Sequence, residues 1–289
     1  MSEGGSRFRS PRTGWLGGVH DWLGNAAGWA RWRRRTLARL PFPVLRSDVR
    51  DVIYATWAVP ANVAHALVPP GVTLVEREGR VLLTVLSYAH GHFGPALAGP
   101  LRRLFPSPSQ SNWRFYVDTL AGAVPPEPTV FFIANVFSTA LYALGTRLFS
   151  DALPSHLAGR FSLRCDEAGC AVEIEGGGSA PSLTLQAQQS APAVPVALRA
   201  FFADWSAAVA TLAVQDAAIA DVPDANTLAL ARIDLPIALD EVVPLAPTAY
   251  RPGALLCELG AIEPPFCFLV PRVPFRVLSE RLVRAPAPL

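Results

Sequence analysis

The stretch Gln110-Ser111-Asn112-Trp113-Arg114-Phe115-Tyr116-Val117-Asp118 decides the fold class of this chain. Polar and apolar side chains alternate along it, which is the period of a β-strand with one buried face. The apolar members therefore point into a core, and the polar members share the opposite face. That polar face carries Asn112, Arg114, Tyr116 and Asp118.

Two interpretations of the polar face are open. If it meets solvent, Arg114 pairs with Asp118 or with a carboxylate of a neighbouring strand. If it lines the inside of a barrel, an arginine flanked by asparagine and tyrosine is a receptor for an organic carboxylate, because the planar guanidinium matches two carboxylate oxygens.

Strand patterns dominate on both sides of this stretch. Two hairpins are predicted, one around Arg77-Glu78-Gly79 and one between Arg160–Cys165 and Cys170–Glu175. Further strands are expected at Val52–Val59, Thr129–Val136, Ser182–Gln188, Leu228–Leu235, Val242–Leu245, Ala254–Leu259 and Phe266–Val270. Helices are expected at Pro60–Leu67, Ser138–Phe149 and Pro195–Gln215. Because strands and helices do not alternate regularly, we predict an α+β fold: a curved or closed, mostly antiparallel β-barrel with a few packed helices.

The composition excludes one large class of chemistry. The chain has 25 basic residues, and all of them are arginine. Without lysine, no side-chain amine can form a Schiff base with a carbonyl substrate, and lysine-dependent phosphate loops and pyridoxal-phosphate enzymes are excluded as well. A GC-rich coding bias explains the absence of lysine, but the chemical exclusion holds whatever its cause.

The N-terminal segment differs in charge from the rest. Residues 1–50 hold ten arginines and three acidic residues, whereas the remainder is mildly acidic. We expect a disordered tail over residues 1–13 and an amphipathic helix over 14–40, in which Trp15, Trp22 and Trp29 recur every seven residues. This helix is expected to pack its tryptophans on the body. The second interpretation is contact with an anionic membrane surface through residues 15–39. Binding of nucleic acid is disfavoured, because the rest of the chain is acidic. The predicted division is residues 1–48 as tail and helix, and 49–289 as one barrel-like domain.

At this point the chain resembles a known family. Asn112-x-Arg114-x-Tyr116-Val117 is similar to the signature strand of the uncharacterised YqjF-like family, within the acetoacetate decarboxylase-like superfamily. Other similar segments follow in the same order over about residues 50–250. They are Thr56–Pro60, Leu67–Val72, Thr129–Phe132, Arg147–Phe149, Leu153-Pro154, Phe201–Trp205 and Ile233–Pro236.

The resemblance implies a β-barrel or cone that encloses a small-molecule cavity, with Arg114 near it. It does not imply decarboxylase activity, because the members that decarboxylate use a lysine iminium and this chain has no lysine. The chain also carries Gln110 where nearer relatives tend to carry glutamate. We therefore predict a protein that binds a small organic carboxylate through Gln110, Asn112, Arg114 and Tyr116.

If the protein is an enzyme, its chemistry would be lyase- or isomerase-like proton transfer without a Schiff base. Arg114 would stabilise anionic charge while Tyr116 or His90 moves a proton. His90-Gly91-His92 has a spacing compatible with a metal on one strand face, but no third ligand is evident, so we predict neither metal nor cofactor. The alternative function is a non-catalytic interaction protein that docks to a membrane surface or a partner through the N-terminal helix.

The cysteines bear on the compartment. Four cysteines in a chain of 289 residues do not make a disulfide scaffold, although Cys165 and Cys170 can approach each other across their hairpin. We expect buried free thiols and a cytoplasmic protein.

Overall fold

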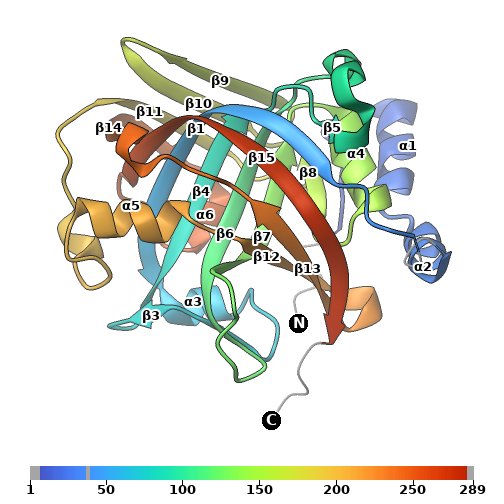
Figure 1. Cartoon of the computed structure of the whole chain (residues 1–289), viewed down its shortest axis with the longest axis horizontal. Helices are drawn as coiled ribbons and strands as arrows, with labels where there is room; N and C mark the ends of the chain where they lie inside the picture. Colours follow the sequence, from blue (N-terminus) through green and yellow to red (C-terminus); the bar gives the residue numbers. More distant parts are fainter. Residues whose placement is uncertain (1–6, 37–39, 285–289) are drawn as a thin grey trace.

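A closed ring of β-strands forms the centre of the molecule (Figure 1). The computed structural model describes residues 7–36 and 40–284. In ring order, the strands are β1 (Leu45–Pro60), β4 (Arg80–Ala89), β6 (Ser109–Leu120), β7 (Thr129–Phe137), β12 (Ala217–Val222), β13 (Thr227–Asp234) and β15 (Phe266–Arg284). The ring closes because β1 pairs with β4 on one side and with β15 on the other.

A second layer of strands continues from β15. It consists of β14 (Val243–Pro252), β11 (Leu183–Gln189), β10 (Gly169–Glu175) and β9 (Arg160–Asp166). Short strands add to the edges: β2 (Val72–Leu74), β3 (Glu76–Arg77), β5 (Gly94–Pro95) and β8 (Ser155–Leu157). The strand pairs of the described residues are antiparallel except β7 with β12 and β7 with β8. The predicted α+β class, with a curved and closed, mostly antiparallel sheet, is confirmed, although the ring is not a regular barrel.

Few helices accompany the sheet. They are α1 (Gly14–Gly24), α2 (Ala27–Thr36), α3 (Ala61–His65), α4 (Ala140–Phe149), α5 (Trp205–Ala213) and α6 (Ala254–Glu258). Short 3-10 helices lie at Ala96–Leu104, Val196–Leu198, Pro223–Ala225 and Leu239–Glu241. Helices α1 and α2 both contact α4, at one side of the ring (Figure 1). No helix in the described part of the chain is long and apolar enough to span a bilayer.

The alternation along β6 separates two cores. Trp113 and Phe115 are fully buried in a cluster that includes Leu185 of β11. On the other face, Tyr116 packs in a second cluster with Leu212 of α5. The ring strands thus present one face to the second layer and the other face to the ring interior, as the period of two predicts.

Several predicted elements are wrong in type or extent. The strand expected at Phe266–Val270, for example, runs on to Arg284. The helix expected at 195–215 is reduced to α5, because the Asp204 side chain accepts the Ala207 N–H at 2.8 Å and caps a helix that begins at Trp205. Residues 254–259 form α6 instead of a strand, because a short apolar run has no period that separates the two structures.

The N-terminal helix is broken into α1 and α2. Trp15 and Trp22 do not pack on the body as expected, whereas Trp29 donates to the Leu148 carbonyl of α4 at 2.9 Å. The Asn25 side chain accepts the Phe8 N–H and donates to the Phe8 carbonyl, both at 2.9 Å, which ends α1 and holds Phe8 in a buried cluster. Residues 7–13 therefore lie against the body, whereas residues 1–6 and 37–39 of the predicted tail and helix fall outside the described residues. The buried face of α1 carries Gly17 and Gly24, while Trp15 and Trp22 are 76% and 72% exposed.

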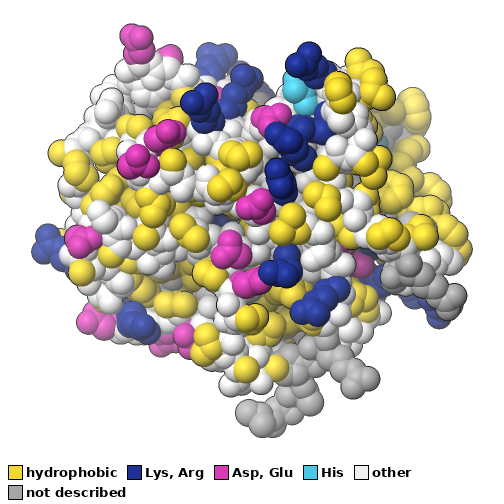
Figure 2. Space-filling view, viewed as in Figure 1, with side chains coloured by type: hydrophobic (Ala, Val, Ile, Leu, Met, Phe, Trp, Pro, Cys, Tyr) yellow, Lys and Arg dark blue, Asp and Glu magenta, His cyan; other side chains and the backbone are white. Residues whose placement is uncertain are grey.

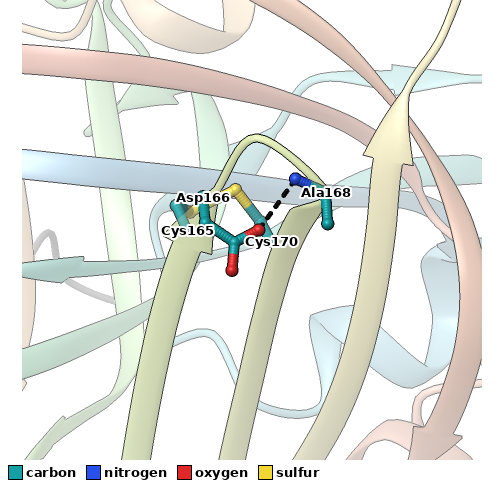
Figure 3. Close-up of a disulfide and its surroundings, with 4 residues drawn as sticks. All are labelled: Cys165, Asp166, Ala168 and Cys170. Carbon is teal, nitrogen blue, oxygen red and sulfur yellow. Dashed lines mark hydrogen bonds between the residues drawn. A yellow bond between two sulfur atoms is a disulfide. The ribbon is translucent and has the colours of Figure 1, made fainter.

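The β9–β10 hairpin carries a disulfide between Cys165 and Cys170 (Figure 3). The two residues are register partners with Cα atoms 4.2 Å apart, and Asp166 Oδ1 accepts the Ala168 N–H in the turn between them. The expectation of free thiols is therefore wrong for this pair. Cys257 and Cys267 are free.

Candidate functional site

A cavity of about 970 Å³ lies inside the strand ring. Every ring strand contributes inward side chains to its wall, as Tyr54 does from β1, Phe132 from β7 and Phe275 from β15. Strand β6 contributes Gln110, Asn112 and Arg114. The side chains of Gln110, Asn112 and Arg114 therefore meet this cavity instead of bulk solvent, whereas Asp118 on the same face of β6 is exposed.

Arg114 is a buried cation without a carboxylate partner. Its side chain is 2% exposed. Nη2 donates to the Leu212 carbonyl at 2.9 Å, Nε is buried without an acceptor, and the guanidinium carbon lies 5.7 Å from the ring centre of Tyr54 and 5.6 Å from that of Tyr116. Among the described residues no carboxylate forms an ion pair with Arg114. Since an uncompensated buried ion costs several kcal/mol, about the magnitude of a strong binding interaction, the site favours an anion.

Partial compensation comes from a helix end. Leu212 lies in the last turn of α5, where carbonyl oxygens lack intrahelical donors and the helix dipole is negative. Its carbonyl accepts from Arg114 and also from the Tyr116 hydroxyl at 3.2 Å. This contact fixes the guanidinium in place, but a helix end carries only about half a charge, so the cation is not neutralised.

A chain of hydrogen bonds runs beside Arg114 and ends at Tyr88. Gln110 Nε2 donates to Asn112 Oδ1 at 2.7 Å, and Asn112 Nδ2 donates to the Tyr88 hydroxyl at 3.2 Å. Gln110 Oε1 lies 2.7 Å from His90 Nε2 and must accept its proton, because an amide oxygen has none to donate. His90 Nδ1 then accepts from the Ser47 hydroxyl at 2.8 Å.

This chain fixes the polarity of the inner end of the cavity. The Asn112 and Tyr88 oxygens each accept one of these bonds, and the Tyr88 O–H, the second N–H of Asn112 and N–H groups of Arg114 remain available as donors. Burial raises the pKa of Tyr88, so its proton is present at neutral pH. These donors suit a ligand that accepts hydrogen bonds.

His90 and Tyr116 do not line this cavity. His90 is fully buried behind Gln110, with its ring stacked at 4.4 Å on Phe93, and burial lowers its pKa to about 4. The Tyr116 hydroxyl donates to Leu212 and lies 3.0 Å from the Thr84 hydroxyl. His90 also lies past the end of β4, so His90 and His92 are not on a strand face. Of the predicted site residues, the structure brings Gln110, Asn112 and Arg114 to the cavity wall.

Tyr54 and Tyr88 are wall residues that the sequence analysis missed. Tyr88 is the register partner of Gln110 on the neighbouring strand, and Tyr54 lies under Arg114. The pairing of β4 with β6 would have identified Tyr88. Once the two strands are paired, the inward residues of β4 are those opposite the inward residues of β6.

A second polar cluster lies on the part of the cavity wall that is formed by α2, α4 and β15. Asp151 pairs with Arg33 at 2.6 Å and with Arg34 at 2.7 Å. Glu280 accepts from the Ser150 hydroxyl and from the Asp151 N–H, both at 2.6 Å, and burial raises the pKa of its carboxyl group. In contrast to Arg114, each charged group in this cluster has a partner within the chain.

Comparison with known proteins identifies the family. The model of the DUF2071 family, described as an uncharacterized conserved protein, matches residues 46–190, which is half of the chain. The chain belongs to the DUF2071 family. This confirms the predicted YqjF-like relationship. No curated protein matches the chain.

Solved structures show that the DUF2071 chain has the acetoacetate decarboxylase-like fold. An acetoacetate decarboxylase from Legionella pneumophila is 13% identical, with a TM-score of 0.55 over 84% of this chain and 88% of its own. An acetoacetate decarboxylase-like enzyme from Sphingomonas wittichii RW1 is 10% identical, with a TM-score of 0.57 over 84% and 94%. The enduracididine biosynthesis enzyme MppR complexed with pyruvate is 12% identical, with a TM-score of 0.55 over 85% and 91%.

Proposed function

We propose that this protein binds an organic carboxylate inside the strand ring, with Arg114 as the anchor. The single observation that carries the proposal is a buried guanidinium, without an internal carboxylate partner in the described chain, on the wall of a cavity. Tyr88 and Asn112 supply further donors and orient the ligand. The pyruvate complex of MppR is consistent with a small carboxylate in a cavity of this fold.

The test compares Arg114→Met with the wild type. Methionine keeps much of the side-chain length but removes the charge and all donors. We expect carboxylate binding, measured by calorimetry with butyrate and octanoate, to be lost in the variant while its circular dichroism spectrum is unchanged. Arg160→Met is the matched control, because Arg160 is exposed on β9 and outside the cavity wall.

Native mass spectrometry of the purified wild type gives an independent measurement. A co-purifying acid that is absent from Arg114→Met supports the proposal. Unchanged carboxylate affinity in Arg114→Met would show that the anchor is wrong.

Any catalysis at this site must be lysine-free. Arg114 is positioned to stabilise a developing anion on a molecule bound in the cavity. The predicted proton-transfer roles of Tyr116 and His90 require rearrangement, because Tyr116 donates to Leu212 and His90 donates to Gln110. Tyr88 is better placed to donate a proton to a bound molecule, and a Tyr88→Phe variant that binds but does not turn over a substrate would support this role.

A second function is favoured by the exposed tryptophans of α1. Trp15 and Trp22 lie outward on α1, and Arg31 and Arg35 are exposed on the adjoining α2. Figure 2 shows hydrophobic side chains gathered over the side of the molecule where α1, α2 and α4 lie. Tryptophan beside arginine suits the interface of an anionic bilayer, so we propose peripheral membrane contact through this face.

Vesicle co-sedimentation separates the two functions. The variant Trp15→Ser/Trp22→Ser should lose salt-sensitive binding to vesicles containing phosphatidylserine. Val196→Ser, which removes another exposed apolar side chain, should not. Arg114→Met should pellet like the wild type, and equal pelleting of the tryptophan variant would contradict the membrane contact.

A further inference from the structure

The size of the cavity exceeds what a small organic acid needs. Pockets that hold drug-sized ligands occupy roughly 300–1,000 Å³, and this cavity of about 970 Å³ is at the upper end of that range. Acetate or pyruvate seated at Arg114 would leave most of the volume empty. An empty apolar hollow forgoes dispersion contacts that an occupant would make.

The wall is polar at two places and apolar between them. Val52, Leu86, Phe132, Val273 and Phe275 are among the side chains that line the intervening wall. At the inner end, Tyr88, Asn112 and Arg114 offer donors that are not used within the protein. At the other polar place, Arg33 and Arg34 are ion-paired with Asp151, although Arg33 Nε is buried without an acceptor. Glu280 accepts from the Asp151 N–H, so the charged groups there already have partners in the chain.

The cavity reaches the surface beside apolar side chains. Leu141 and Phe149 of α4 line the cavity and are also exposed. Phe149 packs edge-on against Trp29 of α2, with ring centres 6.1 Å apart. A ligand that extends from Arg114 towards this opening therefore meets hydrocarbon and aromatic walls until it reaches solvent.

We propose that the ligand is a monocarboxylate with an extended apolar tail. The carboxylate accepts from Arg114 and Tyr88, and the tail fills the apolar part of the cavity towards α4. This inference rests on the carboxylate site proposed above and specifies its substrate class. A short dicarboxylate or a sugar acid is disfavoured, because its second polar end would lie against the apolar wall between the two polar places.

The first experiment measures affinity as a function of tail length. Calorimetry on the full chain with butyrate, hexanoate, octanoate and decanoate should show a gain of about fourfold in affinity per methylene, the factor expected for burying one CH₂ group. Octanol and methyl octanoate, which match the tail but lack the anion, should bind at least tenfold more weakly than octanoate.

The second experiment shortens the cavity. Gly145 of α4 lines the wall, and a Cβ at this position would meet no atom within 4 Å, so the side chain of Gly145→Leu begins in open space at the cavity wall. This variant should weaken decanoate at least tenfold and leave butyrate unchanged. Gly28→Leu is the control, since Gly28 of α2 has the same free space but lies outside the wall.

The outcomes separate this inference from the proposed function. Equal affinity for butyrate and decanoate, both abolished in Arg114→Met, overturns the apolar tail and leaves the carboxylate site standing. Equal binding of octanol and octanoate, insensitive to Arg114→Met, overturns the carboxylate site itself. Decanoate binding that is unaffected by Gly145→Leu also overturns the tail, and a panel without any binding overturns both.

Discussion

Exchanging Gln110 for glutamate should reverse the hydrogen-bond chain that ends at Tyr88. In the wild type, the Gln110 amide nitrogen donates to Asn112 Oδ1, and Asn112 in turn donates to Tyr88. A carboxylate cannot donate, so the Asn112 amide must turn and direct its nitrogen at the new carboxylate. The Asn112 oxygen then faces Tyr88 and accepts its proton, which is withdrawn from the cavity.

The expected magnitude follows from the lost contact. A hydrogen bond to a charged group contributes about 1.5–3 kcal/mol, so the loss of the Tyr88 donor alone should weaken carboxylate binding roughly 10- to 150-fold. The new carboxylate also lines the cavity that holds Arg114, and its charge opposes the ligand. His90 would gain an anionic partner in place of an amide, so its pKa should rise from about 4 towards or above the ordinary 6.5.

Two measurements check the Gln110→Glu variant together. Calorimetry with octanoate reports the affinity, and an NMR titration of the imidazole signals, assigned with a His90→Gln variant, reports the pKa. Gln188→Glu is the control for an added negative charge, because Gln188 is exposed on β11. If Gln110→Glu binds octanoate like the wild type and His90 still titrates near pH 4, the proposed polarity of the chain is refuted.

Three further predictions concern stability. Without ligand, Arg114→Met should raise the free energy of unfolding by about 1–2 kcal/mol, because an apolar side chain avoids the desolvation of an unpaired cation. Urea denaturation measures this change, and a lower midpoint in the variant would contradict the prediction. Burial lowers the pKa of His90 to about 4 and that of His156 to about 3, so between pH 6.5 and 4 the unfolded chain binds more protons than the folded one. Stability should therefore fall as the pH falls through this window, by up to about 1.4 kcal/mol per pH unit for each histidine, and equal denaturation curves at pH 7 and pH 5 would argue against it. Cys165→Ser/Cys170→Ser should lower the free energy of unfolding by about 2 kcal/mol, the chain-entropy contribution of so short a loop, without changing octanoate affinity, because neither cysteine lines the cavity; a shift in affinity would contradict that separation.

The sequence predicted the two faces of β6 correctly, because side chains alternate between the faces of a strand with a period of two. Along β6, Trp113 and Phe115 are buried on one face while Asn112 and Arg114 lie on the other, as alternation requires. The period alone left open whether Arg114 meets solvent or a hollow, because that depends on the closure of β1 on β15, a contact between residues more than two hundred positions apart. The resemblance to a family supplied this closure, which the residues did not.

The sequence could not predict features of the site that depend on which strands pair and in which register. Tyr88 joins the site only because β4 pairs with β6 in a register that places it opposite Gln110. Tyr116 shares its face with Arg114 but has its hydroxyl engaged by Leu212, a carbonyl at the end of a helix whose extent was overestimated. The exposure of Trp15 was missed because the buried side of α1 is formed by Gly17 and Gly24, which let the backbone of Arg12 and the ring of Phe8 approach more closely than a larger side chain would.

The absence of lysine changes what this fold can do with a bound acid. The ring directs alternate residues of every strand into one hollow, so the chemistry of the hollow is set by the residues at inward positions. Here those positions supply a guanidinium, amide groups and phenols, and none of them can condense with a ketone. If a bond to the carboxylate carbon breaks in this cavity, the electron pair must be stabilised by hydrogen bonds on an oxygen of the substrate instead of by an iminium. Arg114 would then be needed both to hold the carboxylate and to stabilise the negative charge that develops on the ketone oxygen as neutral CO₂ leaves. One guanidinium in one position serves the first role better. The geometry therefore favours binding over decarboxylation, and a 3-keto acid incubated with the wild type should lose CO₂ no faster than it does in buffer alone.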